Sequence, residues 1–111
     1  MIENQYPFVS IIIPVKNQAK ELKNALDSLN QINYPKDKLE IIIADGKSTD
    51  NTKEIALRYN ARWILNEKQI VASGRNIAFR IARGEFIAFS DADCTFDSEW
   101  LNNAIKYFQD D

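Results

Sequence analysis

The sequence contains no histidine, and Cys94 is its only cysteine. A single cysteine cannot form an intrachain disulfide. Without histidine the chain can build neither a zinc site of the Cys/His kind nor a catalytic centre that depends on imidazole. Any acid, base or metal ligand must therefore come from carboxylate side chains.

An excess of charge of one sign is also absent, because 14 basic residues stand against 16 acidic ones and the formal net charge is -2. No basic patch of the kind that binds DNA or RNA stands out, so we expect no nucleic-acid partner. No apolar run approaches the roughly 18 residues that a membrane span needs, and the N-terminus lacks a basic segment followed by an apolar one. We expect these residues to lie in the cytoplasm, while segments missing from this chain could bring a longer protein to the cytoplasmic face of a membrane.

Glycine is scarce: the 3 glycines form neither a G-x-G-x-x-G motif nor a Walker A loop. A dinucleotide dehydrogenase or a P-loop enzyme is therefore disfavoured. The chain of 111 residues is otherwise typical of a folded protein, with 45% hydrophobic and 11% aromatic residues. This content is enough for one modest core, so we expect residues 1–111 to form a single domain.

Four short apolar segments alternate with four segments of helical periodicity. The expected strands are residues 8–14, 39–44, 61–65 and 85–90. Apolar residues spaced three and four apart indicate helices at about 18–32, 51–59 and 73–82, and from 98 to the end of the chain. Gly84 is expected to end the third helix in the left-handed conformation that glycine favours. This order predicts an α/β protein of three layers, in which helices cover both faces of a mostly parallel sheet.

Carboxylates follow two of the expected strands directly: Asp45 after the second, and Asp91 and Asp93 after the fourth. Ligands of open parallel sheets bind beyond the carboxyl ends of the strands, near the point where the strand order reverses. If the order is 3-2-1-4, which is an assumption by analogy, the three carboxylates should converge on one crevice. Two carboxylates spaced by one residue offer hard oxygen ligands to Mg²⁺ or Mn²⁺, and a phosphate ester can fill the remaining positions. The alternative is that Asp91 and Asp93 merely cap the turn before the last helix.

The sequence resembles the family 2 glycosyltransferases, which have the Rossmann-like GT-A fold, over essentially its whole length. The segments that carry this resemblance are VSIIIPVKN (9–17), YP (34–35), EIIIADGKSTDNT (40–52), GRNIA (74–78) and ARGEFIAFSDAD (82–93). Each segment alone is weakly specific, but five in the order and spacing of the family are strong evidence. The resemblance implies the N-terminal half of a GT-A domain, the part that binds the nucleotide sugar, truncated from a longer glycosyltransferase.

The resemblance also implies roles for individual residues in binding the donor. The backbone at Pro14 and Val15 would border the base, and Asp45 would accept a hydrogen bond from the base ring. Asp91 would reach the ribose or the diphosphate and would also be a ligand of the metal. Asp93 would be the metal ligand, with Mn or Mg as the divalent cofactor.

Four further residues have two interpretations each. Arg75 stands where the family often places a cation near the nucleotide, which suits a diphosphate, but it could equally be a solvated charge on a helix. Asn17 could contact the donor or cap a helix. Cys94 is interpreted as a small packed residue rather than a nucleophile, and Trp63 as a core or interface aromatic.

The activity implied by the resemblance is transfer of a sugar from a nucleotide-sugar donor, a UDP-sugar in particular, to a saccharide or lipid-linked acceptor, with inversion and with assistance from the metal. Inversion needs a general base that deprotonates the acceptor hydroxyl, and the resemblance places this base beyond Asp111. We therefore expect this chain alone to bind the donor and to be inactive or nearly so. The alternatives are a nucleotidyltransferase, which should carry a glycine-rich basic loop where this chain has residues 16–20, and a non-catalytic Mg²⁺-binding module of doubly wound architecture.

Overall fold

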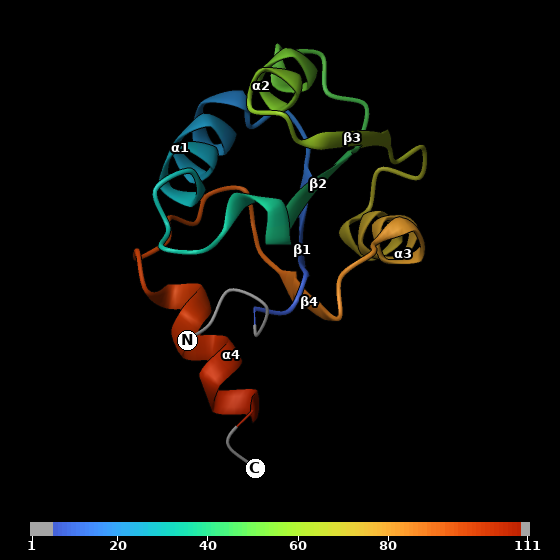
Figure 1. Cartoon of the computed structure of the whole chain (residues 1–111). Helices are drawn as coiled ribbons and strands as arrows, with labels where there is room; N and C mark the ends of the chain where they lie inside the picture. The colour runs from blue at the N-terminus through green and yellow to red at the C-terminus, as the bar shows by residue number, and fades with distance from the viewer. Residues whose placement is uncertain (1–5, 110–111) are drawn as a thin grey trace.

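The computed structural model describes residues 6–109, which contain one sheet of four parallel strands in the order β3-β2-β1-β4. The strands are β1 (Val9–Val15), β2 (Leu39–Asp45), β3 (Arg62–Leu65) and β4 (Phe86–Phe89). The helices are α1 (Ala19–Leu29), α2 (Thr52–Arg58), α3 (Val71–Ile81) and α4 (Trp100–Gln109), with a short 3-10 helix, η2 (Lys36–Lys38), before β2. Figure 1 shows α1 and α2 on one face of the sheet and α3 on the other. The predicted α/β architecture and strand order are confirmed.

The core is divided by the sheet into two apolar clusters. The larger cluster lies on the face covered by α1 and α2, and the smaller one, formed by Ile12, Ile42, Ala44 and Ala78, lies against α3. Successive side chains of a strand point to opposite faces, so a run such as Ile11–Ile13 supplies both clusters. Every residue of β1 is buried. Burial of each of its large aliphatic side chains stabilises the folded state by about 1.5–3 kcal/mol.

Helix α3 begins at Val71, two residues before the predicted start, and ends at Ile81, after which Ala82 is extended. No glycine among the described residues has a positive φ, so the predicted left-handed conformation of Gly84 was wrong. Glycine is needed at this position for space. A Cβ atom on Gly84 would lie 2.6 Å from the backbone nitrogen of Ser10 and 2.7 Å from the carbonyl oxygen of Phe86. None of the described helices is both long and apolar enough to cross a membrane.

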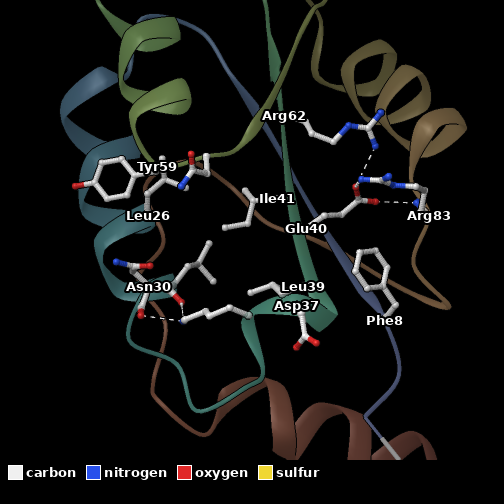
Figure 2. A pocket seen from close by; sticks show the side chains of 13 residues that line it. Phe8, Leu26, Asn30, Asp37, Leu39, Glu40, Ile41, Tyr59, Arg62 and Arg83 are labelled. Atoms are coloured by element: carbon white, nitrogen blue, oxygen red, sulfur yellow. Dashed lines mark hydrogen bonds and ion pairs between the residues drawn. The ribbon is translucent and has the colours of Figure 1, made fainter. Parts of the chain in front are cut away.

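A buried carboxylate, Glu40, joins four segments near the amino ends of the strands. Its Oε1 accepts hydrogen bonds from the guanidinium groups of Arg62 at 3.0 Å and Arg83 at 3.3 Å. Its Oε2 accepts from the Ser10 hydroxyl at 2.6 Å and from the Arg83 amide at 2.7 Å. Figure 2 shows both arginines reaching Glu40 at the rim of an open hollow of about 510 Å³. Burial alone would raise the pKa of Glu40, but these hydrogen bonds outweigh it and the pKa lies below its usual value.

Glu40 is expected to make stability depend on pH. Because the pKa is lowered in the folded state, the contribution of Glu40 is present above the pKa of the unfolded chain, near 4.5, and is lost as the pH falls through the folded value. We expect Glu40→Gln to lower the free energy of unfolding at pH 7 by about 1–3 kcal/mol. The difference from the wild type should shrink below pH 4.5, as measured by urea denaturation across a pH series.

Asp37→Asn provides a matched control for this prediction, because Asp37 is an exposed carboxylate that lines the same hollow. This variant should change the free energy of unfolding by less than about 0.5 kcal/mol, both at pH 7 and below pH 4.5. A difference between wild type and Glu40→Gln that stays constant from pH 7 to pH 3 would refute the proposed role of the charge.

Candidate functional site

The site is built on the carboxyl edge of the sheet, where β1 and β2 end together and β4 ends earlier. Val15 pairs with Asp45, whereas the last pair of β4 joins Phe89 to Ile12. The chain after β4 therefore runs beside the end of β1. Because β1 lies between β2 and β4, the end of β2 at Asp45 and the turn that follows β4 are on opposite sides of β1 along this edge.

Asp91, Asp93 and Cys94 come together in the turn that follows β4. Each offers one ligand atom, and these atoms lie within 4.8 Å of one another. Ala92 is only 2% exposed, whereas both aspartates are exposed, so the buried alanine anchors the turn and leaves the two carboxylates in solvent. Cys94 is exposed as well, and its interpretation as a packed residue was wrong. Exposed carboxylate oxygens grouped in this way are suitable ligands for Mg²⁺ or Mn²⁺.

The capping role that the sequence left open for Asp91 and Asp93 belongs to Asp97. Helix α4 begins at Trp100, and the Asp97 carboxylate accepts a hydrogen bond of 3.1 Å from the Glu99 amide. A carboxylate near a helix start satisfies amides that have no partner inside the helix. The carboxylates of Asp91 and Asp93 are thus not needed to start α4.

Arg75, in the first half of α3, faces the same turn. Its Nη2 lies 3.9 Å from Oδ1 of Asp91, and its Cζ lies 5.8 Å from the centre of the Phe89 ring. The paired side chains are 44% and 68% exposed, so this ion pair contributes only about 0–1 kcal/mol and can readily exchange for another partner. A hollow of about 500 Å³, lined in part by Arg75, Asp91, Cys94 and Asp97, opens beside them. A cation and carboxylates around one open hollow suit a diphosphate with its metal ion.

Asp45 does not join this cluster. It stands two residues after Ile43, which packs in the larger apolar cluster, so its side chain turns toward the face of α1 and α2. The residue is 2% exposed; its Oδ1 accepts from the Ser48 amide and its Oδ2 from the Trp63 indole, both at 2.9 Å. Asp45 thus lies outside the group formed by Asp91, Asp93 and Cys94, and Asp91 instead approaches Arg75 of α3. The bond from Trp63 was missed, since only the strand register, which pairs Trp63 with Ile43, reveals that it shares a face with Asp45.

The loops after β1 and β2 are joined by Asn17. Its φ of 51° is in the left-handed region, which asparagine tolerates, and the residue before α1 is Gln18 rather than Asn17. The amide of Asn17 donates to the Ser48 hydroxyl at 2.8 Å, and its Oδ1 accepts from the Thr49 amide at 2.7 Å. Asn17 therefore positions the edge that includes Asp45 rather than capping a helix.

Pro14 and Val15 are buried at the end of β1 and line a smaller hollow of about 110 Å³. Gly46 and Gln69 line the same hollow, and Lys16 donates to the Gln69 side chain at 2.7 Å. This hollow lies at the same edge of the sheet as Asp45 because the Gly46 amide donates to the Val15 carbonyl at 2.8 Å. The predicted base-bordering residues are thus adjacent to Asp45 along the edge.

A family model and a curated relative both match the sequence of this chain, and both are glycosyltransferases. The family model described as glycosyl transferase family 2 matches residues 10–111. Among curated proteins, Glycosyltransferase AglE of Haloferax volcanii is 35% identical over 106 residues, which is 90% of this chain and 35% of that protein.

Two solved structures are similar in fold and sequence. The mannosyltransferase PcManGT from Pyrobaculum calidifontis, in complex with GDP-Man and Mn²⁺, has a TM-score of 0.85 and 32% identity, covering 97% of this chain and 34% of that chain. Residues 1–349 of TarS from Staphylococcus aureus, a poly(ribitol-phosphate) beta-N-acetylglucosaminyltransferase, have a TM-score of 0.85 and 31% identity, covering 91% of this chain and 32% of that chain. TarS has also been solved with UDP-GlcNAc. This chain thus spans about a third of the length of AglE and of these two solved chains.

Proposed function

Because this chain belongs to glycosyl transferase family 2, we propose that it is the donor-binding part of an inverting glycosyltransferase that uses a UDP-sugar and a saccharide or lipid-linked acceptor. The observation that carries the proposal is the grouping of Asp91 with Asp93 on the carboxyl edge of the sheet, where Arg75 and Asp91 line an open hollow. The GDP-Man and Mn²⁺ bound to PcManGT, and the UDP-GlcNAc bound to TarS, support a nucleotide-sugar donor for this chain.

Asp93 and Asp91 would hold the divalent ion, Mn²⁺ or Mg²⁺. The fit is good, because both carboxylates are exposed and their only ion pair in the described residues, between Asp91 and Arg75, is long and weak. When bound, the ion neutralises charge that develops on the diphosphate leaving group. Arg75 can exchange Asp91 for a diphosphate oxygen, since a guanidinium offers several donors to such an oxygen group.

The base would lie at the other end of the site, next to Pro14, Val15 and Asp45, with Asn17 holding the two loops together. A nucleoside diphosphate needs separate subsites for its base and its diphosphate. The position of β1 between β2, which ends at Asp45, and β4, which precedes Asp91, is consistent with two such subsites.

The alternatives considered from the sequence have less support. Residues 16–20 (KNQAK) contain no glycine, unlike the basic glycine-rich loop expected of a nucleotidyltransferase. Family membership favours glycosyl transfer over a non-catalytic Mg²⁺-binding module. The general base and the acceptor site are proposed to lie outside this chain.

The proposal is tested by calorimetric titration of this chain with UDP, with and without Mn²⁺ or Mg²⁺. We expect either ion to tighten UDP binding at least tenfold, because the ion screens the diphosphate against two carboxylates. Uridine, which has no phosphate, is the matched ligand control and should bind with the same affinity whether or not the ion is present. If the chain binds neither UDP nor GDP in the presence of Mn²⁺, the proposal is wrong.

A further inference from the structure

We propose that the hollow at the amino end of β2 binds an extended segment of a partner polypeptide in which acidic side chains alternate with apolar ones. The hollow has a volume of about 510 Å³ and lies where β3 leaves part of β2 without a neighbouring strand. This edge of the sheet is opposite to the carboxyl edge that carries the proposed donor site, so the inference does not depend on the proposed function.

The shortness of α2 explains why β2 is only partly covered. Helix α2 has 7 residues and is about 10 Å long, whereas the 7 residues of β2 span about 23 Å. The chain therefore returns to the sheet before it reaches the start of β2, and the first pair between the two strands joins Arg62 to Ile42. Residues Leu39–Ile41 pair with β1 on one side, and no strand within residues 6–109 pairs with them on the other. Such a stretch can exchange backbone hydrogen bonds with an added strand.

On one face of this stretch the hollow is apolar. Leu39 and Ile41 point to the face of the larger apolar cluster but are only partly buried. Leu26 and Tyr59 line the hollow on the same side (Figure 2). An added strand that places apolar side chains over these residues would remove their exposed surface from water, which favours binding.

The other face of the stretch carries an excess of positive charge. Glu40 points to this face, and its Oε1 is shared by the guanidinium groups of Arg62 and Arg83 (Figure 2). Two cations thus share one carboxylate, and the Arg83 side chain remains 69% exposed. With Lys36 and Asp37 included, three cations and two carboxylates line the hollow. A guanidinium has several N–H donors, so each arginine can bind a carboxylate of the partner while it keeps its bond to Glu40.

These two faces define the chemistry of the partner. In an extended segment beside Leu39–Ile41, successive side chains point alternately to the two faces. Those on the apolar face would contact Leu39 and Ile41, and those on the other face would be acidic and contact Arg62 and Arg83. Lysine side chains in the acidic positions would be repelled by the two guanidinium groups, so the site should discriminate by charge.

The test titrates the ¹⁵N-labelled chain with the peptide acetyl-EVEVE-amide and follows the backbone amides by NMR. The glutamates of this peptide lie on one face of an extended strand and its valines on the other. We expect the signals of Leu39–Ile41 and Arg62 to shift most. Hydrogen exchange of at least one amide within Leu39–Ile41 should slow about fivefold or more in the saturated complex. The peptide acetyl-KVKVK-amide, with reversed charges, should bind about tenfold more weakly.

Arg83→Gln should weaken binding of acetyl-EVEVE-amide about threefold to fivefold, because it removes one exposed cation from the hollow. The backbone amide of residue 83, which donates to Glu40, is kept in this variant. Arg80→Gln is the matched control, since Arg80 is an exposed arginine of α3 that lines a different hollow. Its affinity for the peptide should equal that of the wild type, and an equal loss in both variants would contradict a specific role of Arg83.

Three further results would overturn the inference. The first is absence of binding by acetyl-EVEVE-amide. The second is equal binding of acetyl-VVEEE-amide with unchanged hydrogen exchange at Leu39–Ile41, which would mean that the hollow attracts anions without adding a strand. The third is a shift of the same signals when the chain alone is concentrated, which would make a second copy the occupant. None of these results bears on the proposed function, which is tested with UDP and a metal ion.

Discussion

Asp93→Ala is expected to weaken Mn²⁺-dependent binding of UDP about 100-fold, because substitutions even one shell away from a metal commonly cost 10–100-fold in metal affinity. Asp93 is exposed, and the carboxylate that accepts a hydrogen bond near the start of α4 is that of Asp97. Its removal should therefore leave the fold intact, with a change in the free energy of unfolding below about 0.5 kcal/mol. The measurement is titration of UDP at fixed Mn²⁺, together with titration of Mn²⁺ at fixed UDP.

Asp97→Ala is the control for this substitution, since Asp97 is another exposed carboxylate of the segment between β4 and α4 and its removal changes the charge equally. It should lower stability by about 0.5–2 kcal/mol through the lost cap and leave Mn²⁺-dependent binding close to that of the wild type. Equal losses of binding in the two variants would mean that the total negative charge of this segment, and not a specific ligand, attracts the ion. Full Mn²⁺ dependence in Asp93→Ala would show that Asp93 does not hold the metal.

Gly84→Ala is expected to lower the free energy of unfolding by about 3 kcal/mol, at the upper end of the usual range for overpacking. The new Cβ would lie 2.6 Å from the Ser10 nitrogen and 2.7 Å from the Phe86 carbonyl oxygen, and backbone atoms cannot turn aside as a flexible side chain can. Any shift of Gly84 also strains its bond to the Ser10 hydroxyl, at 2.9 Å, which lies beside the Glu40 cluster. Because domains of this size have only about 5–15 kcal/mol of stability, urea denaturation should show a clearly lower midpoint.

Gly46→Ala tests whether the loss of stability in Gly84→Ala comes from a lack of space for the Cβ atom or from the replacement of any glycine. The nearest atom to a Cβ on Gly46 would be the Cα of Gln69 at 3.3 Å, a contact that small shifts relieve, and the φ of Gly46 is not positive. We expect this variant to lose less than about 1 kcal/mol. Similar losses for the two alanine variants would contradict the steric explanation for Gly84.

The order of strands and helices could be predicted from the sequence because the signals are local. An apolar β-branched run such as residues 9–13 indicates a buried strand, and apolar residues three and four apart indicate a helix wherever the chain later places them. The Asp91–Asp93 pair could be recognised for the same reason, since one short turn brings both carboxylates together without help from distant residues. The family resemblance carried by these segments is confirmed by the match over residues 10–111.

Features that depend on how separate segments meet could not be predicted. The sequence alone placed Asp45 at a strand end, and the tertiary structure decided that its carboxylate faces Trp63 and Ser48 rather than Asp91. Likewise, the glycine at position 84 is explained only by the approach of Ser10, 74 residues away in the chain. Strand register and close backbone contacts result from long-range packing, and local patterns of apolar and polar residues carry almost no information about either.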